Sequence, residues 1–333
     1  MIAVSIVIPT RNRAKLLKLA LNSIVSQTLS YDEFEVIVVD NGSTDQTCNV
    51  AKSFKEEITN FKYIYDANPG LHVGRHRGML ESTGDILVYA DDDIEAFPSW
   101  LESVEEAFQD PNVAMVGGNN LPMFLEAPPK WLTILWKKAS FFYGYNVLPA
   151  LSILQLPEVM REFSPHYVWG CNFAIRKSVL LDAGGFHPDG MPQELIRFRG
   201  DGETHVSRYV AETGLKCMFH PGATVYHKVT QGRMTKAYFR QRGFNQGISD
   251  SYTALRNQDI QSVSNNNNLF KRTARWLIRQ AKERIHLGAD AREALSEMKY
   301  GHREGYAYHQ NCYQKDSEVR AWVHKEKYYE ESA

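Results

Sequence analysis

Four apolar segments alternate with helical patterns through the first 90 residues, and this alternation constrains the fold more than any other feature. The apolar segments, rich in β-branched residues, cover 4–8, 35–40, 61–65 and 85–90. Apolar residues at helical spacing cover the intervening stretches 14–27, 46–54 and 73–82. Because parallel strands need a crossover helix between them, the alternation predicts a mostly parallel sheet flanked by helices on both faces.

Polar side chains end three of the predicted strands. Pro9 and Thr10 follow the first strand, Asp40 ends the second, and Asp91–Asp93 follow the fourth. The carboxyl ends of neighbouring parallel strands meet at one edge of a sheet, and ligands bind beyond that edge in folds of this class. The topology alone therefore predicts a binding site where these residues converge.

The charge balance and the lack of long apolar runs exclude several classes of protein. The 333 residues include 38 Lys and Arg against 39 Asp and Glu, which argues against a nucleic-acid binder that works by bulk charge. No apolar run approaches the roughly 18 residues of a membrane-spanning helix. The first residues lack the basic region of a signal peptide, and the four cysteines are widely spaced. We expect reduced thiols and a cytoplasmic location.

Asp91–Asp93 carries the sharpest chemical signal. Three adjacent carboxylates repel one another, and burying them without partners is costly. Oxygen ligands at i and i+2 suit Mn²⁺ or Mg²⁺, ions that usually also bind substrate phosphates. The alternative is a solvated acidic loop at the end of a strand. The buried character of the preceding strand and the polar ends of its neighbours favour a metal site.

Three motifs in order resemble those of the family 2 glycosyltransferases: Pro9–Arg13, Val38–Asp45 and Asp91–Asp93. The likeness covers about residues 2–245. It implies the GT-A fold, an α/β architecture with a mostly parallel central sheet, here with a C-terminal helical extension. It also implies an inverting, metal-dependent transfer of a sugar from a nucleotide-diphosphate donor, most often UDP-linked. The implied acceptor is a hydroxyl group on a growing glycan or a lipid-linked saccharide, as in polysaccharide biosynthesis.

The resemblance also divides the chain. It implies a GT-A domain over residues 1–230, with a nucleotide-binding half (1–118) and an acceptor half (119–230), followed by a mainly helical region at 231–333. Within that region, residues 271–284 contain six Lys or Arg and one acidic residue, Glu283, beside Trp276. This pattern suits peripheral contact with the inner face of a membrane. A solvated helix face is the alternative.

The residues expected to bind the donor come from the resemblance. They are Pro9, Thr10, Asn12, Arg13, Asp40, Arg75, Asp91, Asp92, Arg233 and Arg240. Pro9, Thr10 and Arg13 would line the pocket for the base, Asp40 would meet the base or ribose, and Asp91 would contact the ribose. A helix-capping turn is the alternative for Asp40.

Three arginines outside the strand ends complete the expected donor site. The resemblance directs Arg75 to the nucleotide or its phosphates, although His76 stands where the family usually has Asn. Arg233 and Arg240 lie in a basic, glycine-containing segment that can close over a diphosphate. The alternatives are a surface charge at Arg75 and a solvated basic helix face at the other two.

The expected general base lies in the segment Arg199–Thr204. In the family, a Glu-Asp pair at the start of this helix supplies the base. Glu203 falls on the base position and Gly202 on its partner, so Glu203 is the first choice and Asp201 the second. A carboxylate that follows a Gly-rich turn, partly shielded from water, can accept the proton of an acceptor hydroxyl. The alternative is an N-terminal cap formed by Asp201.

The remaining assignments concern the metal and the acceptor. The expected ligands of Mn²⁺ or Mg²⁺ are Asp93, Asp91 and His227, although a lone histidine is more often a core or surface residue. On the acceptor side we expect Trp169, which can stack on a sugar ring, and Asn172. A buried tryptophan is the alternative for Trp169.

The same residues argue against several other classes of enzyme. A nucleotidyltransferase would share the architecture and the metal, but it should have a Gly-rich loop where Pro9–Arg13 contains no glycine. The GxGxxG motif of a Rossmann dehydrogenase and the GxxxxGK[ST] motif of a P-loop enzyme are absent. A non-catalytic nucleotide-sugar-binding scaffold stays open, because Gly202 departs from the family's pattern.

Overall fold

The first 90 residues form the parallel sheet that the sequence predicts. The computed structural model describes residues 2–257 and 287–330. The strands of this part are β1 (Val4–Thr10), β2 (Phe34–Asp40), β3 (Phe61–Tyr65) and β4 (Ile86–Ala90). The intervening helices are α1 (Ala14–Val25), α2 (Thr47–Ser53), the short η1 (Phe54–Glu56) and α3 (Leu71–Glu81). β1 lies between β2 and β4, β3 pairs with β2, and all three pairings are parallel.

The same sheet continues with strands from the middle of the chain. These are β6 (Val113–Gly117), β10 (Arg161–Glu162), β11 (Asn172–Arg176) and β12 (Lys216–Phe219). The order across the described sheet is β10-β12-β6-β11-β4-β1-β2-β3. β11 is antiparallel to both β4 and β6, and β10 is antiparallel to β12. The sheet is therefore parallel where the nucleotide half was expected and mixed beyond it.

A second, smaller sheet was not anticipated from the sequence. Its strands are β5 (Ile94–Ala96), β7 (Asn120–Phe124), β8 (Asn146–Leu148), β9 (Ile153–Gln155) and β13 (Val225–Val229). β13 pairs with β5 in a register that sets His227 opposite Ile94. Because Asp93 directly precedes Ile94, this register brings a histidine from late in the chain to the acidic triplet.

Helices cover both faces of the larger sheet, and side chains alternate along its strands to meet them. Ile6 and Ile8 of β1 pack on the face covered by α1, α2 and α4 (Trp100–Ala107). Val7 packs on the opposite face, against α3, α6 (Lys177–Asp182) and α7 (Glu203–Thr213). Since all seven residues of β1 are buried, the near-continuous apolar pattern of this strand reflects burial on both sides. The sheet flanked by helices is thus confirmed.

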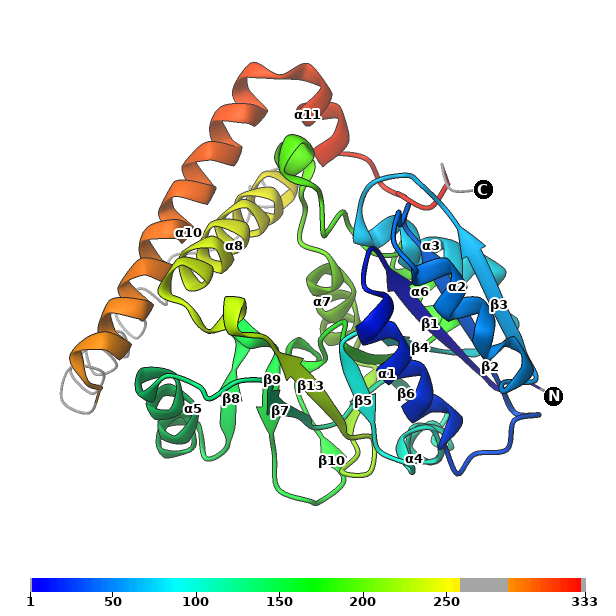
Figure 1. Cartoon of the computed structure of the whole chain (residues 1–333). Helices are drawn as coiled ribbons and strands as arrows, with labels where there is room; N and C mark the ends of the chain where they lie inside the picture. Colours follow the sequence, from blue (N-terminus) through cyan, green and yellow to red (C-terminus); the bar gives the residue numbers. More distant parts are fainter. Residues whose placement is uncertain (1, 258–286, 331–333) are drawn as a thin grey trace.

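The C-terminal region is helical, as predicted, and forms a long arm beside the sheets (Figure 1). Its described helices are α8 (Lys236–Asn257), α10 (Ala289–Lys315) and α11 (Ser317–Val323). The remaining elements are α5 (Lys130–Tyr143) and the short helices η2 (Pro149–Leu151), η3 (Pro165–Tyr167), η4 (Gln193–Phe198) and η5 (Gln231–Met234). The basic segment 271–284 lies outside the described residues. In the described part of the chain, none of the helices combines the length and apolarity needed to cross a bilayer.

Glycines let α8 and α10 pack with their backbones in contact. Each helix carries two glycines four positions apart: Gly243 and Gly247 on α8, and Gly301 and Gly305 on α10. A Cβ on Gly247 would lie 2.0 Å from the carbonyl oxygen of His302, and one on Gly305 would lie 1.9 Å from a carbonyl oxygen of α8. No side chain fits at these positions, so spaced small residues define this seam, as they do in close helix pairs generally.

Candidate functional site

A cavity of about 340 Å³ opens at the carboxyl edge of β1 and β4. Its volume falls within the range of ordinary small-molecule sites. The lining residues are Pro9, Thr10, Arg11, Arg13, Asn41, Gly70, Leu71, Asp91, Asp92 and Gly190. The predicted donor residues Pro9, Thr10, Arg13, Asp91 and Asp92 are thus brought together at the edge that the topology predicted.

Arg13 ties the acidic triplet to the start of α1. Its Nη1 lies 2.9 Å from Oδ1 of Asp92 and 3.0 Å from Oδ2 of Asp93. Thr10 donates a hydrogen bond of 2.7 Å to the other oxygen of Asp92. Burial raises the pKa of Asp92 to about 7, against the opposing charge of Arg13. Asp92 is therefore a buried, partnered carboxylate and not part of a solvated acidic loop.

Asp93 also faces His227 of β13 and Arg233 of η5. Nε2 of His227 lies 3.3 Å from Oδ1 of Asp93, and Nη1 of Arg233 lies 3.2 Å from both Oδ2 of Asp93 and Nε2 of His227. Burial would raise the pKa of Asp93, but His227 and the two neighbouring arginines hold it below its ordinary value. Asp93 is therefore an ionised carboxylate in a positively charged surrounding.

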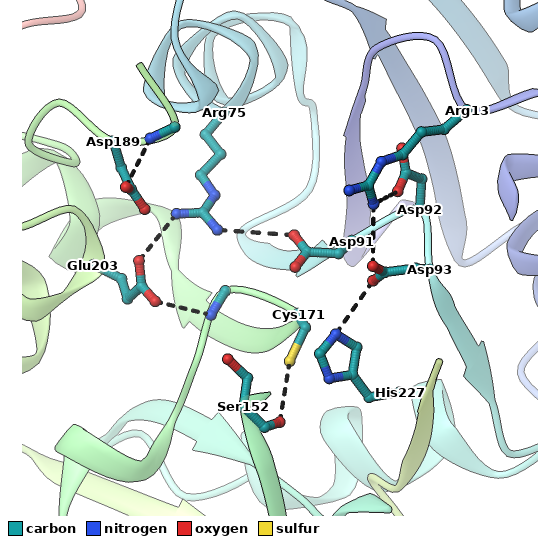
Figure 2. A network of polar contacts seen from close by, with 12 residues as sticks. Arg13, Arg75, Asp91, Asp92, Asp93, Ser152, Cys171, Asp189, Glu203 and His227 are labelled. Atoms are coloured by element: carbon teal, nitrogen blue, oxygen red, sulfur yellow. Dashed lines mark hydrogen bonds and ion pairs between the residues drawn. The ribbon is translucent and has the colours of Figure 1, made fainter. Parts of the chain in front are cut away.

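Arg75 links the triplet to the start of α7 (Figure 2). Its side chain is 3% exposed, with Nη1 3.3 Å from Oε2 of Glu203 and Nη2 3.9 Å from Oδ1 of Asp91. Gly170 leaves room for this guanidinium, because a Cβ there would lie 1.8 Å from Nη2. The backbone N–H of Gly170 also donates to Oε1 of Glu203 at 3.4 Å. Arg75 is thus a buried bridge and not a surface charge.

The two candidate bases lie in different surroundings. The Glu203 side chain is 22% exposed, whereas that of Asp201 is 2% exposed. Asp201 accepts hydrogen bonds from Nδ1 of His187 (2.6 Å), from Thr253 (2.7 Å) and from Arg208 (2.9 Å). Burial would raise the pKa of Asp201, but the hydrogen bond from His187, with Thr253 and Arg208, holds it well below its ordinary value. Both oxygens of Asp201 are therefore engaged, while Glu203 faces the solvent-accessible side.

The structure gives a physical reason for Gly202. Its φ is +56° and its ψ is −127°, a backbone conformation that L side chains rarely adopt. A Cβ at this position would also lie 3.0 Å from Oδ2 of Asp189. A second acidic residue before Glu203 would be strained here, so the departure from the Glu-Asp pattern follows from the local backbone.

Two predicted donor residues shape the turn beneath the cavity instead of lining it. Asp40 is fully buried and accepts hydrogen bonds from the N–H of Ser43 and the hydroxyl of Tyr63, both at 2.7 Å. Asn12 is exposed, has a φ of 53°, and accepts a hydrogen bond of 2.7 Å from the N–H of Thr44. Asn12 therefore joins the loops after β1 and β2, while Asp40 fixes the loop after β2 to β3.

Arg240 lies apart from this network. Its guanidinium contacts Glu297 (3.4 Å) and Glu304 (3.0 Å) on α10 and stacks over the ring of Tyr300. The structure therefore pairs Arg240 with the neighbouring helix and does not bring it to the acidic triplet.

The two residues expected on the acceptor side differ in accessibility. Asn172 is 3% exposed, and its Nδ2 donates to Oδ1 of Asn120 (3.1 Å) and to the carbonyl of Ala223 (2.9 Å). Its Oδ1 accepts from Nε1 of Trp100 at 2.9 Å, so the amide joins the two sheets. Trp169 is half-buried, with its ring 6.5 Å from that of Tyr167. Only Trp169 of this pair presents a partly open surface.

Some lining residues were not among those predicted: Arg11, Asn41, Gly70, Leu71 and Gly190. Arg11 lies in the motif 9–13 and Asn41 in the motif 38–45, but nothing in the sequence separates them from their neighbours as ligand-binding residues. Gly70 has a φ of +117°, and Gly190 has a φ of +61°. The Asn-Pro-Gly and Asp-Gly sequences around them indicate turns, yet only the fold shows that both turns face the cavity.

The residues around Asp93 fit a divalent cation. A carboxylate oxygen of Asp91 and a ring nitrogen of His227 lie within 4.8 Å of each other, and Asp93 contacts His227 directly. Within the described chain, Oδ1 of Asp93 and Nδ1 of His227 are buried and have no hydrogen-bond partner. Mn²⁺ and Mg²⁺ prefer oxygen ligands, which the two carboxylates can supply, and His227 adds a nitrogen atom to this set.

Comparisons with known proteins point in one direction. The family model described as "Glycosyl transferase family 2" matches residues 5–183. Glycosyltransferase AglE of Haloferax volcanii is 37% identical over 117 residues, which cover 35% of this chain and 38% of that protein. The glucosyl-dolichyl phosphate glucuronosyltransferase of the same organism is 24% identical over 238 residues, covering 68% of this chain and 69% of that protein.

Solved structures share the fold at low sequence identity. The mannosyltransferase PcManGT from Pyrobaculum calidifontis, in complex with GDP-Man and Mn²⁺, is 18% identical with a TM-score of 0.52. The alignment covers 99% of this chain and 85% of that one. TarS 1-349 from S. aureus, in complex with UDP-GlcNAc, is 14% identical with a TM-score of 0.52, and the alignment covers 94% of this chain and 92% of that one. This chain therefore has the architecture of those transferases.

Proposed function

Because the chain belongs to glycosyl transferase family 2, we propose that it transfers a sugar from a nucleotide-diphosphate donor to a hydroxyl acceptor with inversion. The chain is a glycosyltransferase with the GT-A fold, and the proposal concerns its donor, metal, acceptor and catalytic residues. One observation carries the proposal. The acidic triplet and Glu203 meet at one site, where the buried guanidinium of Arg75 bridges Asp91 and Glu203.

The cavity supports a nucleotide diphosphate as the donor. Pro9, Thr10, Asn41, Asp91 and Asp92 all line it, and we assign the first three to the base and the two carboxylates to the side of the diphosphate. Arginine side chains on that side supply the paired N–H groups that bind phosphate oxygens well. The two structural relatives hold GDP-Man and UDP-GlcNAc, so a nucleoside diphosphate is the shared chemistry. We propose UDP as the nucleotide.

Asp93, His227 and Asp91 are the proposed ligands of Mn²⁺ or Mg²⁺. Bound there, the ion would neutralise charge that grows on the leaving diphosphate. Arg13 and Arg233 both contact Asp93 and contribute positive charge at the same place. The chain's own residues therefore provide both the ligands of the ion and two further cationic groups for the diphosphate.

Glu203 is the proposed general base. Its two oxygens are held by Arg75 and by the N–H of Gly170, and part of its side chain stays accessible to an acceptor. As the acceptor oxygen bonds to the anomeric carbon, the bond from that carbon to the diphosphate breaks and the hydroxyl proton moves to Glu203. Since Asp201 already accepts three hydrogen bonds, we assign it to positioning α7 rather than to proton transfer.

A lipid-linked saccharide is the proposed acceptor. The relative that matches 68% of this chain is named for a dolichyl phosphate-linked substrate. Trp169 offers an aromatic, half-buried surface beside Gly170, whose N–H contacts the proposed base. We further propose that residues 1–118 bind the donor, that residues 119–230 bind the acceptor, and that the basic segment 271–284 meets a membrane surface from the cytoplasmic side.

The test compares E203Q with E212Q, a matched change at an exposed glutamate of the same helix. Thermal shifts are measured with UDP- and GDP-sugars, each with Mn²⁺, Mg²⁺ or EDTA, and transfer is measured separately. We expect E203Q to keep the metal-dependent donor shift and to lose transfer by at least about 100-fold, as for loss of a general base. E212Q should keep both.

Different results would support other functions. Donor binding without transfer to any acceptor by the unmodified chain would favour a nucleotide-sugar-binding scaffold. Release of pyrophosphate from a nucleoside triphosphate would favour a nucleotidyltransferase. Transfer by E203Q at the normal rate would exclude Glu203 as the base, and a donor shift that ignores EDTA would exclude the metal.

A further inference from the structure

A sulfur, a nitrogen and an oxygen ligand atom converge beside the acidic triplet. The thiol of Cys171, a ring nitrogen of His227 and a carboxylate oxygen of Asp91 all lie within 4.8 Å of one another. Figure 2 shows the three side chains: Cys171 directly precedes β11, His227 lies in β13 and Asp91 lies in the turn after β4. Cys171 is 2% exposed and His227 is 1% exposed, so two of the three groups are shielded from water.

The surrounding protein makes little polar use of this sulfur. Within the described residues, its hydrogen-bond partner is the carbonyl oxygen of Ser152, at the long distance of 4.0 Å. Cys171 also belongs to the apolar core on the α1 side of the sheet, so its sulfur has a packing role beside this one weak polar contact. Nδ1 of His227 is buried without a hydrogen-bond partner, whereas Nε2 of the same ring lies 3.3 Å from Oδ1 of Asp93. The sulfur of Cys171 and Nδ1 of His227 are therefore available to bind a metal ion.

The spacing is close to that of a tetrahedral metal site. Ligand atoms bound to Zn²⁺ at about 2.0–2.3 Å are about 3.3–3.8 Å apart. Side-chain rotations that draw the three atoms together by about 1 Å would reach this spacing from the outer limit of 4.8 Å. Thiolates bind Zn²⁺ strongly, whereas Mg²⁺ and Mn²⁺ prefer oxygen ligands.

We propose that Cys171, His227 and Asp91 form a site for a thiophilic divalent cation of the Zn²⁺ class. On binding, the sulfur–hydrogen bond breaks, the proton leaves to solvent and a sulfur–metal bond forms, with no change of oxidation state. This ligand set shares His227 and Asp91 with the set proposed for Mn²⁺ or Mg²⁺. A cation held by the sulfur would therefore compete with the hard cation and exclude the donor complex.

Cobalt provides a spectroscopic test, because a thiolate bound to Co²⁺ gives a charge-transfer band in the near ultraviolet. The full chain is titrated with Co²⁺ without nucleotide, in a C48S/C312S background that removes the two partly exposed thiols. We expect the band in this background, its loss in C171A and C171S, and its retention in C217S. Cys217 is equally buried but belongs to no such cluster in the described chain, so it is the matched control.

Competition by Zn²⁺ gives a second measurement. Zn²⁺ should displace Co²⁺ from the background protein, and its affinity should fall by at least about 10-fold in C171A. A missing band, or a band that persists in both Cys171 variants, would overturn the proposal. The titration uses no donor, so it stands apart from the proposed function. C171A should still show the Mn²⁺-dependent thermal shift with the donor. If the unmodified chain shows no such shift, that result counts against the proposed function and not against the thiol site.

Discussion

Replacing Gly247 with alanine tests the backbone contact between α8 and α10. The new Cβ would lie 2.0 Å from the carbonyl oxygen of His302 and 2.7 Å from the backbone nitrogen of Tyr306. Neither atom belongs to a side chain that can turn away. Restoring an ordinary contact of about 3.4 Å needs the helices to separate by about 1.4 Å. Because backbone atoms cannot turn away, we take the upper part of the range for overpacking, about 2–3 kcal/mol, and the better helix propensity of alanine returns about 1 kcal/mol.

The assay is urea unfolding followed by circular dichroism. We expect G247A to lower the free energy of unfolding by about 1–2 kcal/mol, the difference between these two effects. G232A is the control, because Gly232 is exposed and a Cβ there would meet nothing within 4 Å. Its change should stay within about 0.5 kcal/mol. The reasoning is refuted if G247A is as stable as the wild type, or if G232A is destabilised equally.

Three further predictions concern the site and its supports. G170A places a Cβ 1.8 Å from Nη2 of Arg75, so transfer should fall while the urea midpoint changes little; normal kcat would contradict the close approach. N172A leaves Nε1 of Trp100 buried without its acceptor, and unfolding measurements should show a loss of about 2–3 kcal/mol, with a loss under 1 kcal/mol as the contrary result. Burial lowers the pKa of His72 from its ordinary 6.5 to about 4. Between these two values the unfolded chain binds a proton that the folded chain does not, so stability decreases as the pH is lowered from about 6.5 to about 4. H72F should therefore lose about 2 kcal/mol less than the wild type between pH 7 and pH 5, and parallel pH profiles would exclude this account.

The sequence predicts the part of the fold in which each strand or helix has its own clear periodic pattern of apolar residues. The strands β1 to β4 alternate with helices at clear spacing, and their polar ends meet as the topology requires. The acidic triplet and Arg75 could be recognised because their charges need partners and because their motifs are local. The seam of α8 and α10 was not recognised, although its paired glycines are visible in the sequence.

The remaining features depend on contacts between distant segments. The small sheet joins strands of three to five residues from 94 to 229, too short for a periodic signal. The burial of Asn172 between Trp100 and Ala223 is decided by tertiary packing, which a polar residue beside a strand does not reveal. Arg240 was placed by its basic neighbourhood, but α10 supplies acidic partners that lie about sixty residues further along the chain.

The bridge formed by Arg75 has a consequence for recombining this protein with its relatives. Arg75 and Glu203 are 128 positions apart and belong to the two halves that we assign to donor and acceptor. A chimera that joins residues 1–118 of another transferase to the rest of this chain would replace the arginine and keep the glutamate. Glu203 would then lose its ion pair with Arg75 unless the incoming half has an arginine at the same position. If the proposed roles of the two halves hold, we expect exchange of the halves to give an active protein only between parents that share this pair.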